Sequence, residues 1–134
     1  MKRWVYFQPN EKDLKDEVGD CAIRAVCKAF NMDWITAFDA LCVYARKNQC
    51  LPNQEKAIHP FFEDAGWHYT SMGKGKRINV ADLAKTLEKS PVIANVRVGY
   101  RTHLVAIQDG QYFDTWDCGT RLVYGYWSKE RREP

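Results

Sequence analysis

Apolar residues between positions 20 and 89 recur at three- and four-residue intervals, the spacing of one face of an α-helix. This spacing predicts helices over residues 20–30, 34–47, 55–65 and 80–89. Asp20, Asp33 and Asn79 stand at three of the starts, and all are residue types that favour helix N-caps. Pro60 either divides the third predicted helix or marks its start, because proline has no backbone N–H to donate.

From residue 92 onward the pattern changes to short apolar runs that are typical of strands. Strands are predicted over residues 92–98, 103–108, 111–117 and 121–127, with an earlier one over 67–72 and a loop over 73–77. Helices followed by an antiparallel meander are typical of the α+β class. We therefore expect a single domain over residues 1–134, in which N-terminal helices pack on a C-terminal antiparallel sheet.

A hairpin in the second half of the chain can be predicted in register. The dipeptide Asp109-Gly110 favours a two-residue type I′ turn, and this turn fixes which residues face each other. In that register His103 faces Trp116, and Asp114 is a diagonal neighbour of His103 on the same face, about 7–8 Å away at the backbone. Asp117 has the opposite parity and is expected on the other face. We therefore expect His103 and Asp114 to hydrogen-bond, with Trp116 covering the bond.

The composition is that of a folded protein, with 46% hydrophobic and 28% charged residues. The net charge is only +3, and the basic clusters at 74–77 and 129–132 are typical of solvated surface, so no nucleic-acid partner is expected. The basic start lacks the apolar run of a signal peptide, and no later stretch is long enough to span a bilayer. These features favour a cytoplasmic protein that has no membrane partner.

The five cysteines are an odd number in a chain without a secretion signal, which favours free thiols over a disulfide framework. They form no Cys-x-x-Cys pair, and the three histidines are scattered, so we expect no metal and no other cofactor. Cys27 and Cys42 fall on the inner faces of predicted helices, where cysteine usually serves packing.

Cys21 differs from the other cysteines because it stands at a predicted helix start, directly after Asp20. The positive end of the helix dipole favours the thiolate, which is the nucleophilic form. A catalytic thiol also needs a base, and His103 held by Asp114 would supply one. Arg24, one turn later, is expected to pair with a carboxylate such as Asp20 rather than with a substrate.

The motifs around these residues resemble the papain-like cysteine peptidases, and in size the compact bacterial and phage-borne members of that superfamily. The run Gly19-Asp20-Cys21 is similar to the Asp-Cys at the head of the peptidase domains of bacteriocin exporters. Asp114-Thr115-Trp116 looks like the Asn-Ser-Trp of the family, and the order Cys, His, Asp also matches. The resemblance is specific over about residues 18–30 and 101–116.

The resemblance implies a papain-like fold in which the nucleophile begins the central helix. Cys21 would be the nucleophile, His103 the base and acid, Asp114 the residue that orients the histidine, and Trp116 a shield. Asp20 would support the site from the position before the cysteine.

One position departs from the family pattern. The family usually has a glutamine several residues before the cysteine to donate to the oxyanion, but Lys15 stands six residues before Cys21. Gln8 or Asn10 could supply that amide if the loop over 11–18 folds back, with the backbone N–H of Cys21 as the second donor.

These residues together predict a small cysteine peptidase that cleaves a peptide or isopeptide bond of a peptide or protein substrate through a thioester on Cys21. Two alternatives stay open. A papain-fold acyltransferase uses the same residues but passes the acyl group to an amine, and a binding or inhibitory protein of mobile-element (phage) origin uses the groove without turnover. An open cleft above the thiol favours an enzyme, whereas a thiol walled off by Trp116 or Trp4 favours the binding protein.

Overall fold

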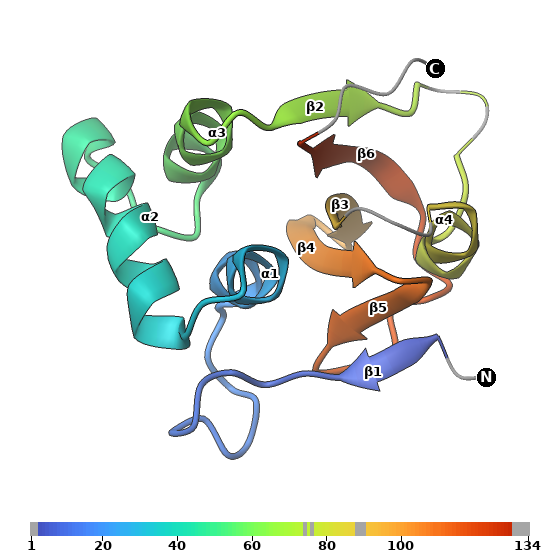
Figure 1. Ribbon diagram of the computed structural model, residues 1–134, viewed down its shortest axis with the longest axis horizontal. Helices are drawn as coiled ribbons and strands as arrows, with labels where there is room; N and C mark the ends of the chain where they lie inside the picture. The colour runs from blue at the N-terminus through green and yellow to red at the C-terminus, as the bar shows by residue number, and fades with distance from the viewer. Residues whose placement is uncertain (1–2, 74, 76, 88–90, 130–134) are drawn as a thin grey trace.

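The computed structural model describes residues 3–73, 75, 77–87 and 91–129, and shows a sheet with helices on both faces (Figure 1). The helices in these ranges are α1 (Cys21–Phe30), α2 (Trp34–Asn48), α3 (Glu55–Asp64) and α4 (Val80–Thr86). The strands are β1 (Trp4–Tyr6), β2 (His68–Ser71), β3 (Val92–Val98), β4 (Arg101–Gln108), β5 (Gln111–Asp114) and β6 (Val123–Ser128). The chain is therefore α+β, as predicted.

Parts of three predictions lie outside the described residues: the end of the fourth helix at 88–89, positions 74 and 76 of the basic loop, and most of the cluster at 129–132. Within the described ranges, no helix has the length and apolar character needed to cross a membrane.

The sheet has the strand order β1-β5-β4-β3-β6-β2 and is mixed, because β1 runs parallel to β5 while the other neighbours are antiparallel. The prediction of a C-terminal antiparallel meander is therefore wrong in two respects. β1 and β2 come before α4 in the chain rather than from the C-terminal run of strands, and β6 pairs with β3 instead of following β5. Trp4–Tyr6 is too short to show a strand period, and it occupies the edge of β5 that a meander would have given to β6.

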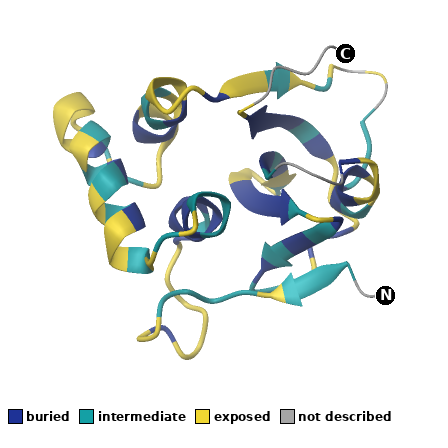
Figure 2. Ribbon diagram, in the orientation of Figure 1, coloured by how far each residue is buried: buried dark blue, intermediate teal, exposed yellow. Residues whose placement is uncertain are grey.

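Successive side chains of the central strands point to opposite faces of the sheet and pack into two separate hydrophobic cores. Ile93, Leu104 and Ala106 face α1, α2 and α3, whereas Val92 and Val105 face α4. The sheet thus lies between two helical layers rather than beneath one, which corrects the prediction of helices on one face. Figure 2 shows the consequence: the central strands and α1 are largely buried, and the outer side of α2 is exposed.

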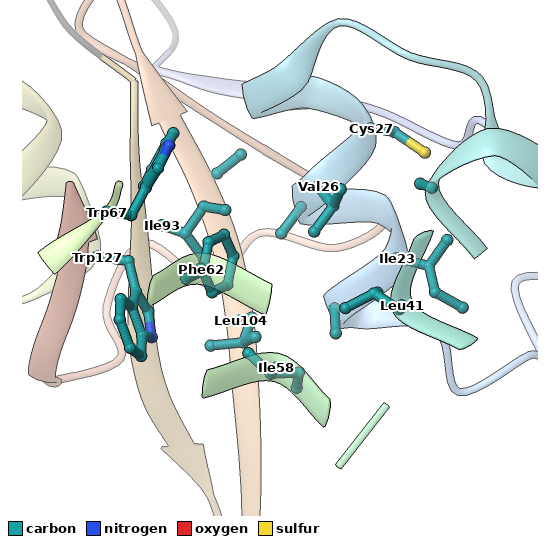
Figure 3. Packing of buried hydrophobic residues seen from close by; sticks show 14 residues of the cluster. Ile23, Val26, Cys27, Leu41, Ile58, Phe62, Trp67, Ile93, Leu104 and Trp127 are labelled. Atoms are coloured by element: carbon teal, nitrogen blue, oxygen red, sulfur yellow. The ribbon is translucent and has the colours of Figure 1, made fainter. Parts of the chain in front are cut away.

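The larger core is built around stacked aromatic rings (Figure 3). Phe62 of α3 is fully buried, and its ring stacks on Trp127 of β6 at 5.1 Å between centroids. Trp67 closes the same group from the loop after α3, with its ring 5.6 Å from that of Phe62. Val26 of α1 and Ile93 of β3 complete the contact between helix and sheet. Packing against this core fixes α1, and therefore its first residue, relative to β4.

Helix starts are capped as predicted in two of three cases. Asp33 accepts from the Thr36 N–H and Asn79 accepts from the Asp82 N–H, both at 2.8 Å. Asp20 occupies the N-cap position of α1, but its side chain makes no cap bond there. The carboxylate of Asp20 instead contacts Arg24 and Trp34.

Pro60 lies inside α3 and does not divide it. A proline at this position removes the donor for the Lys56 carbonyl, which stands four residues earlier in the helix. The side-chain amide of Asn48 donates to that carbonyl instead, at 3.1 Å. The helix therefore tolerates Pro60 because the end of α2 supplies the missing hydrogen bond.

The predicted hairpin register is confirmed where β4 and β5 pair. Ile107 faces Tyr112, and both turn residues, Asp109 and Gly110, have positive φ, as a type I′ turn requires. The pairing runs only to Ala106 and Phe113. Beyond that point side chains rather than backbone groups connect the two strands.

We expect Phe62→Ala to lower the free energy of unfolding by about 3–5 kcal/mol, because it removes the ring at the centre of the aromatic core and leaves a cavity. Ile35→Ala, on the exposed side of α2, should change it by less than about 0.5 kcal/mol. Urea unfolding of both variants measures the difference, and equal effects would contradict this account of the core.

Candidate active site

Cys21 is the first residue of α1 and lies half-buried in a cleft of about 380 Å³. The cleft is walled by the loop before α1 at 16–20, by the β3–β4 hairpin at 98 and 101–103, and by the segment after β5 at 115–116. Asn53 adds a side chain from the loop between α2 and α3. Cys21 therefore lines the cleft together with Trp116.

A series of interacting polar side chains leads from the thiol into the sheet. His103 of β4 and Cys21 influence each other's charge: the imidazole lowers the pKa of the thiol, and the sulfur raises the pKa of the imidazole. Its Nε2 lies 2.5 Å from Asp114 Oδ2 of β5 and donates to it, because an ionised carboxylate only accepts. Nδ1 is therefore the ring nitrogen that remains for the sulfur. The structure brings together the three residues predicted as nucleophile, base and orienting group.

The electrostatics of this chain favour an ion pair. Burial opposes charge on Cys21, but the hydrogen bond and charge of His103, the backbone N–H of Leu104 and the charge of Arg24 outweigh it and lower the pKa of the thiol. Burial also opposes charge on His103, yet Asp114 and Cys21 together raise the pKa of the imidazole to about 9. A thiolate beside an imidazolium is the form that these shifts stabilise.

Three other thiols have pKa values shifted in the opposite direction. Burial raises the pKa of Cys27 to about 12, and it also raises the pKa values of Cys42 and Cys118. Cys21 is thus distinguished from these three cysteines by its neighbours.

Asp114 is held by a second set of contacts on its other oxygen. Its Oδ1 accepts from Arg24 at 3.2 Å and from the Thr115 backbone N–H at 2.7 Å. Arg24 also pairs with Asp20, as predicted, and Asp20 accepts from the indole of Trp34 at 2.8 Å. The contact between Arg24 and Asp114 was not predicted, and it ties the start of α1 to β5.

Trp116 and Asp117 lie where the predicted register of the hairpin places them. The ring of Trp116 lies 5.2 Å from that of His103, close enough to cover it. Asp117 instead accepts from the Tyr112 hydroxyl and the Gly119 N–H. The described contacts of Asp117 are therefore away from the imidazole.

Gln8 and Asn10, the residues suggested as oxyanion donors, are occupied inside the N-terminal loop. The amide of Gln8 donates to Asp16 at 2.8 Å, its oxygen accepts from the Asn10 N–H, and the Asn10 oxygen accepts from the Lys12 N–H. Neither residue is among the described residues that line the cleft. The loop folds on itself, so it does not carry these amides to Cys21.

Asn53 reaches the site although no sequence motif predicts it there. Its Oδ1 accepts from the Ala22 N–H at 3.2 Å and lies 4.0 Å from the sulfur of Cys21. The position of Asn53 depends on how α2 and α3 pack against α1. No local motif reports that packing, which is why sequence reasoning missed this residue.

Three buried side chains could in principle hold a metal ion. Among the described residues, His103, Asp114 and Cys118 offer ligand atoms that all lie within 4.8 Å of one another. Two of these residues already bond to each other, since His103 donates to Asp114. Zinc binds the thiolate, whereas the raised pKa of Cys118 favours the thiol. The group therefore fits a hydrogen-bonded support better than a metal centre.

Comparison with protein-family models, with curated proteins and with solved structures found no match to this chain.

Arg24→Met should lower the free energy of unfolding by about 3–5 kcal/mol, because it leaves the carboxylates of Asp20 and Asp114 buried without their shared cation. Arg46→Met, at an exposed position of α2, is the matched control and should have little effect. Urea unfolding compares the two. An Arg24→Met protein as stable as the wild type would show that this ion pair does not hold α1 to β5.

Proposed function

We propose that this protein is a thiol-dependent hydrolase that cleaves a peptide or isopeptide bond through a thioester on Cys21. The observation that carries the proposal is the grouping of Cys21, His103 and Asp114 at one cleft, in which Asp114 accepts from His103 and His103 lowers the pKa of the Cys21 thiol. A thiol activated by an imidazole, which is in turn oriented by a carboxylate, is the arrangement that nucleophilic catalysis requires.

The reaction follows from the ion pair. The thiolate of Cys21 attacks the carbonyl carbon, a C–S bond forms, and the carbonyl electrons move to oxygen. When the C–N bond breaks, His103 gives its Nδ1 proton to the leaving amine and becomes neutral. A water molecule then attacks the thioester, His103 takes its proton, and the C–S bond breaks to release a carboxylic acid. The ion pair is restored at the end of the cycle.

Asp114 supports both proton transfers without being consumed. Its Oδ2 holds Nε2 of His103, so that Nδ1 stays directed at the sulfur. Because Asp114 is only 1% exposed, water does not compete for that bond. Trp116 adds a ring beside the imidazole.

The shape of the surface favours an extended chain as substrate. The cleft at Cys21 shares Asn53, Arg101 and Thr102 with a second hollow of about 770 Å³ beside α3. The two hollows are therefore neighbours on the surface, and we infer that together they accommodate more of a substrate than a small acyl donor needs. This supports a peptide or protein substrate.

The alternatives have less support. A binding protein would not require a lowered thiol pKa or an open cleft, and both are present at Cys21. Papain-like ancestry remains a proposal too. It is supported by Cys21 at a helix start packed on a sheet and by His103 on a strand of that sheet.

Iodoacetamide should alkylate Cys21 faster than the other cysteines at roughly pH 6 to 7, because its thiolate persists below the range of an ordinary thiol with a pKa of about 8.5. Substituting His103→Ala should slow this reaction by at least about tenfold at that pH, since a thiol without its imidazolium is only a few per cent thiolate. Mass spectrometry of each modified cysteine, measured across pH, gives the rates.

Asp114→Asn should also slow alkylation of Cys21, and Asp117→Asn serves as its matched control because Asp117 bonds elsewhere. Equal reactivity of the accessible cysteines, or an unchanged rate in His103→Ala, would rule out the ion pair.

Turnover can be tested with a peptide library in water labelled with heavy oxygen. The wild type should create new carboxyl termini that carry the label, and Cys21→Ala should create none. The rate should fall as the pH rises through about 9, because His103 then loses the proton that the leaving amine needs. New termini joined to an amine would indicate a transferase, and the absence of new termini would indicate a binding protein. Inhibition by a chelator would assign the chemistry to a metal at His103, Asp114 and Cys118 instead.

A further inference from the structure

The start of α1 is capped by a residue from a distant loop. A helix leaves its first N–H groups without partners inside the helix, and the side chain of the N-cap residue commonly accepts from one of them. Asp20 is in that position, but its oxygens are taken by Arg24 and Trp34. Asn53 Oδ1 accepts from the Ala22 N–H in its place, at 3.2 Å.

This cap bond fixes how the carboxamide of Asn53 is turned. Only the oxygen of a carboxamide can accept from an N–H, so Oδ1 must be the atom at Ala22. Nδ2, with two N–H donors, is then the other end of the same group. Asn53 is exposed and lines the cleft, and its Oδ1 is 4.0 Å from the sulfur of Cys21. The donors are thus carried on a group that sits next to the nucleophile.

We propose that Asn53 is a catalytic residue, whose Nδ2 donates to the substrate oxygen when Cys21 attacks the carbonyl carbon. This role rests on the hydrolase function proposed above. As the C–S bond forms, the carbonyl electron pair moves onto the oxygen, and the Nδ2–H stabilises that negative charge. The pair returns to carbon when the C–N bond breaks. The backbone N–H of Cys21, at the positive end of α1, is placed to act as the second donor.

The position of Asn53 at both hollows agrees with this role. Asn53 is one of the residues shared by the cleft at Cys21 and the hollow beside α3. A chain that occupies both hollows therefore passes over Asn53 as it reaches the sulfur. Gln8 and Asn10 are engaged within their own loop and do not line this path.

Two reactions of Cys21 can show whether Asn53 stabilises the substrate oxygen or only caps α1. Alkylation by iodoacetamide needs the thiolate but develops no negative charge on a carbonyl oxygen, whereas acylation by p-nitrophenyl acetate needs both. The ratio of the acylation rate to the alkylation rate therefore cancels changes in thiolate fraction. It reports the stabilisation of the oxygen.

Asn53→Asp is the decisive variant, because aspartate keeps an acceptor for the Ala22 N–H and loses the two donors. Its melting temperature should match the wild type, while the ratio of acylation to alkylation at Cys21 should fall by about 10²–10³-fold. Asn53→Ala should lower both the ratio and the melting temperature. Gln54→Glu adds the same charge one residue away, keeps the acceptor for the Leu51 N–H, and should leave the ratio unchanged.

The outcomes distinguish the two proposals. A wild type in which Cys21 is acylated, with an unchanged ratio in Asn53→Asp, would show that Asn53 is only a cap. An equal fall of the ratio in Gln54→Glu would assign the effect to charge and also overturn the role. No acylation of Cys21 in the wild type, seen by intact mass against Cys21→Ala, would overturn the hydrolase function and this role with it.

Discussion

A single buried cation holds the site together. Arg24 is only 7% exposed and lies between Asp20 and Asp114, which are each 1% exposed. A guanidinium has five donors in a fixed plane, so it can satisfy two carboxylates at once, which a lysine could not do with the same geometry. Taking these charges out of water is costly, and the arrangement is favourable only because every charge has a partner. Arg24 thereby joins the start of α1, where Cys21 lies, to Asp114, which holds His103.

The site forms where regular backbone pairing stops. β4 and β5 are paired from the turn to Ala106 and Phe113, and beyond that point His103 and Asp114 bond through their side chains. The carboxylate there serves two elements at once, because one oxygen holds the imidazole and the other holds α1 through Arg24. Stability and chemistry therefore share one residue. Substitutions of Asp114 should be interpreted with both roles in mind.

The features that could be predicted are local in sequence. The Asp109-Gly110 turn was sufficient to pair the two strands and to place Asp114 beside His103, because a two-residue turn leaves one register. The caps of α2 and α4 and the pairing of Arg24 with Asp20 also follow from neighbouring residues.

The features that could not be predicted are long-range. β1 is three residues long, and its partner β5 lies at the other end of the chain. Asn53 reaches Cys21 only after α2 and α3 have packed, and no spacing within the sequence encodes that contact. At Asp20, by contrast, a local signal predicted a cap bond that the side chain does not make. Asp20 has the residue type and position of a cap, but its carboxylate pairs with Arg24 one turn later and accepts from the indole of Trp34.

The pairing of β1 with β5 has a consequence for when the candidate site is assembled. Trp4 and Phe7 both donate to the backbone carbonyl of Asp114, and Trp4 is 110 positions away from it in the sequence. A ribosome makes Cys21 and its helix before it makes His103 and Asp114. Contacts between such distant residues form late, because a long loop must close first. The site is therefore complete only after β4 and β5 have been made and β1 has paired with β5.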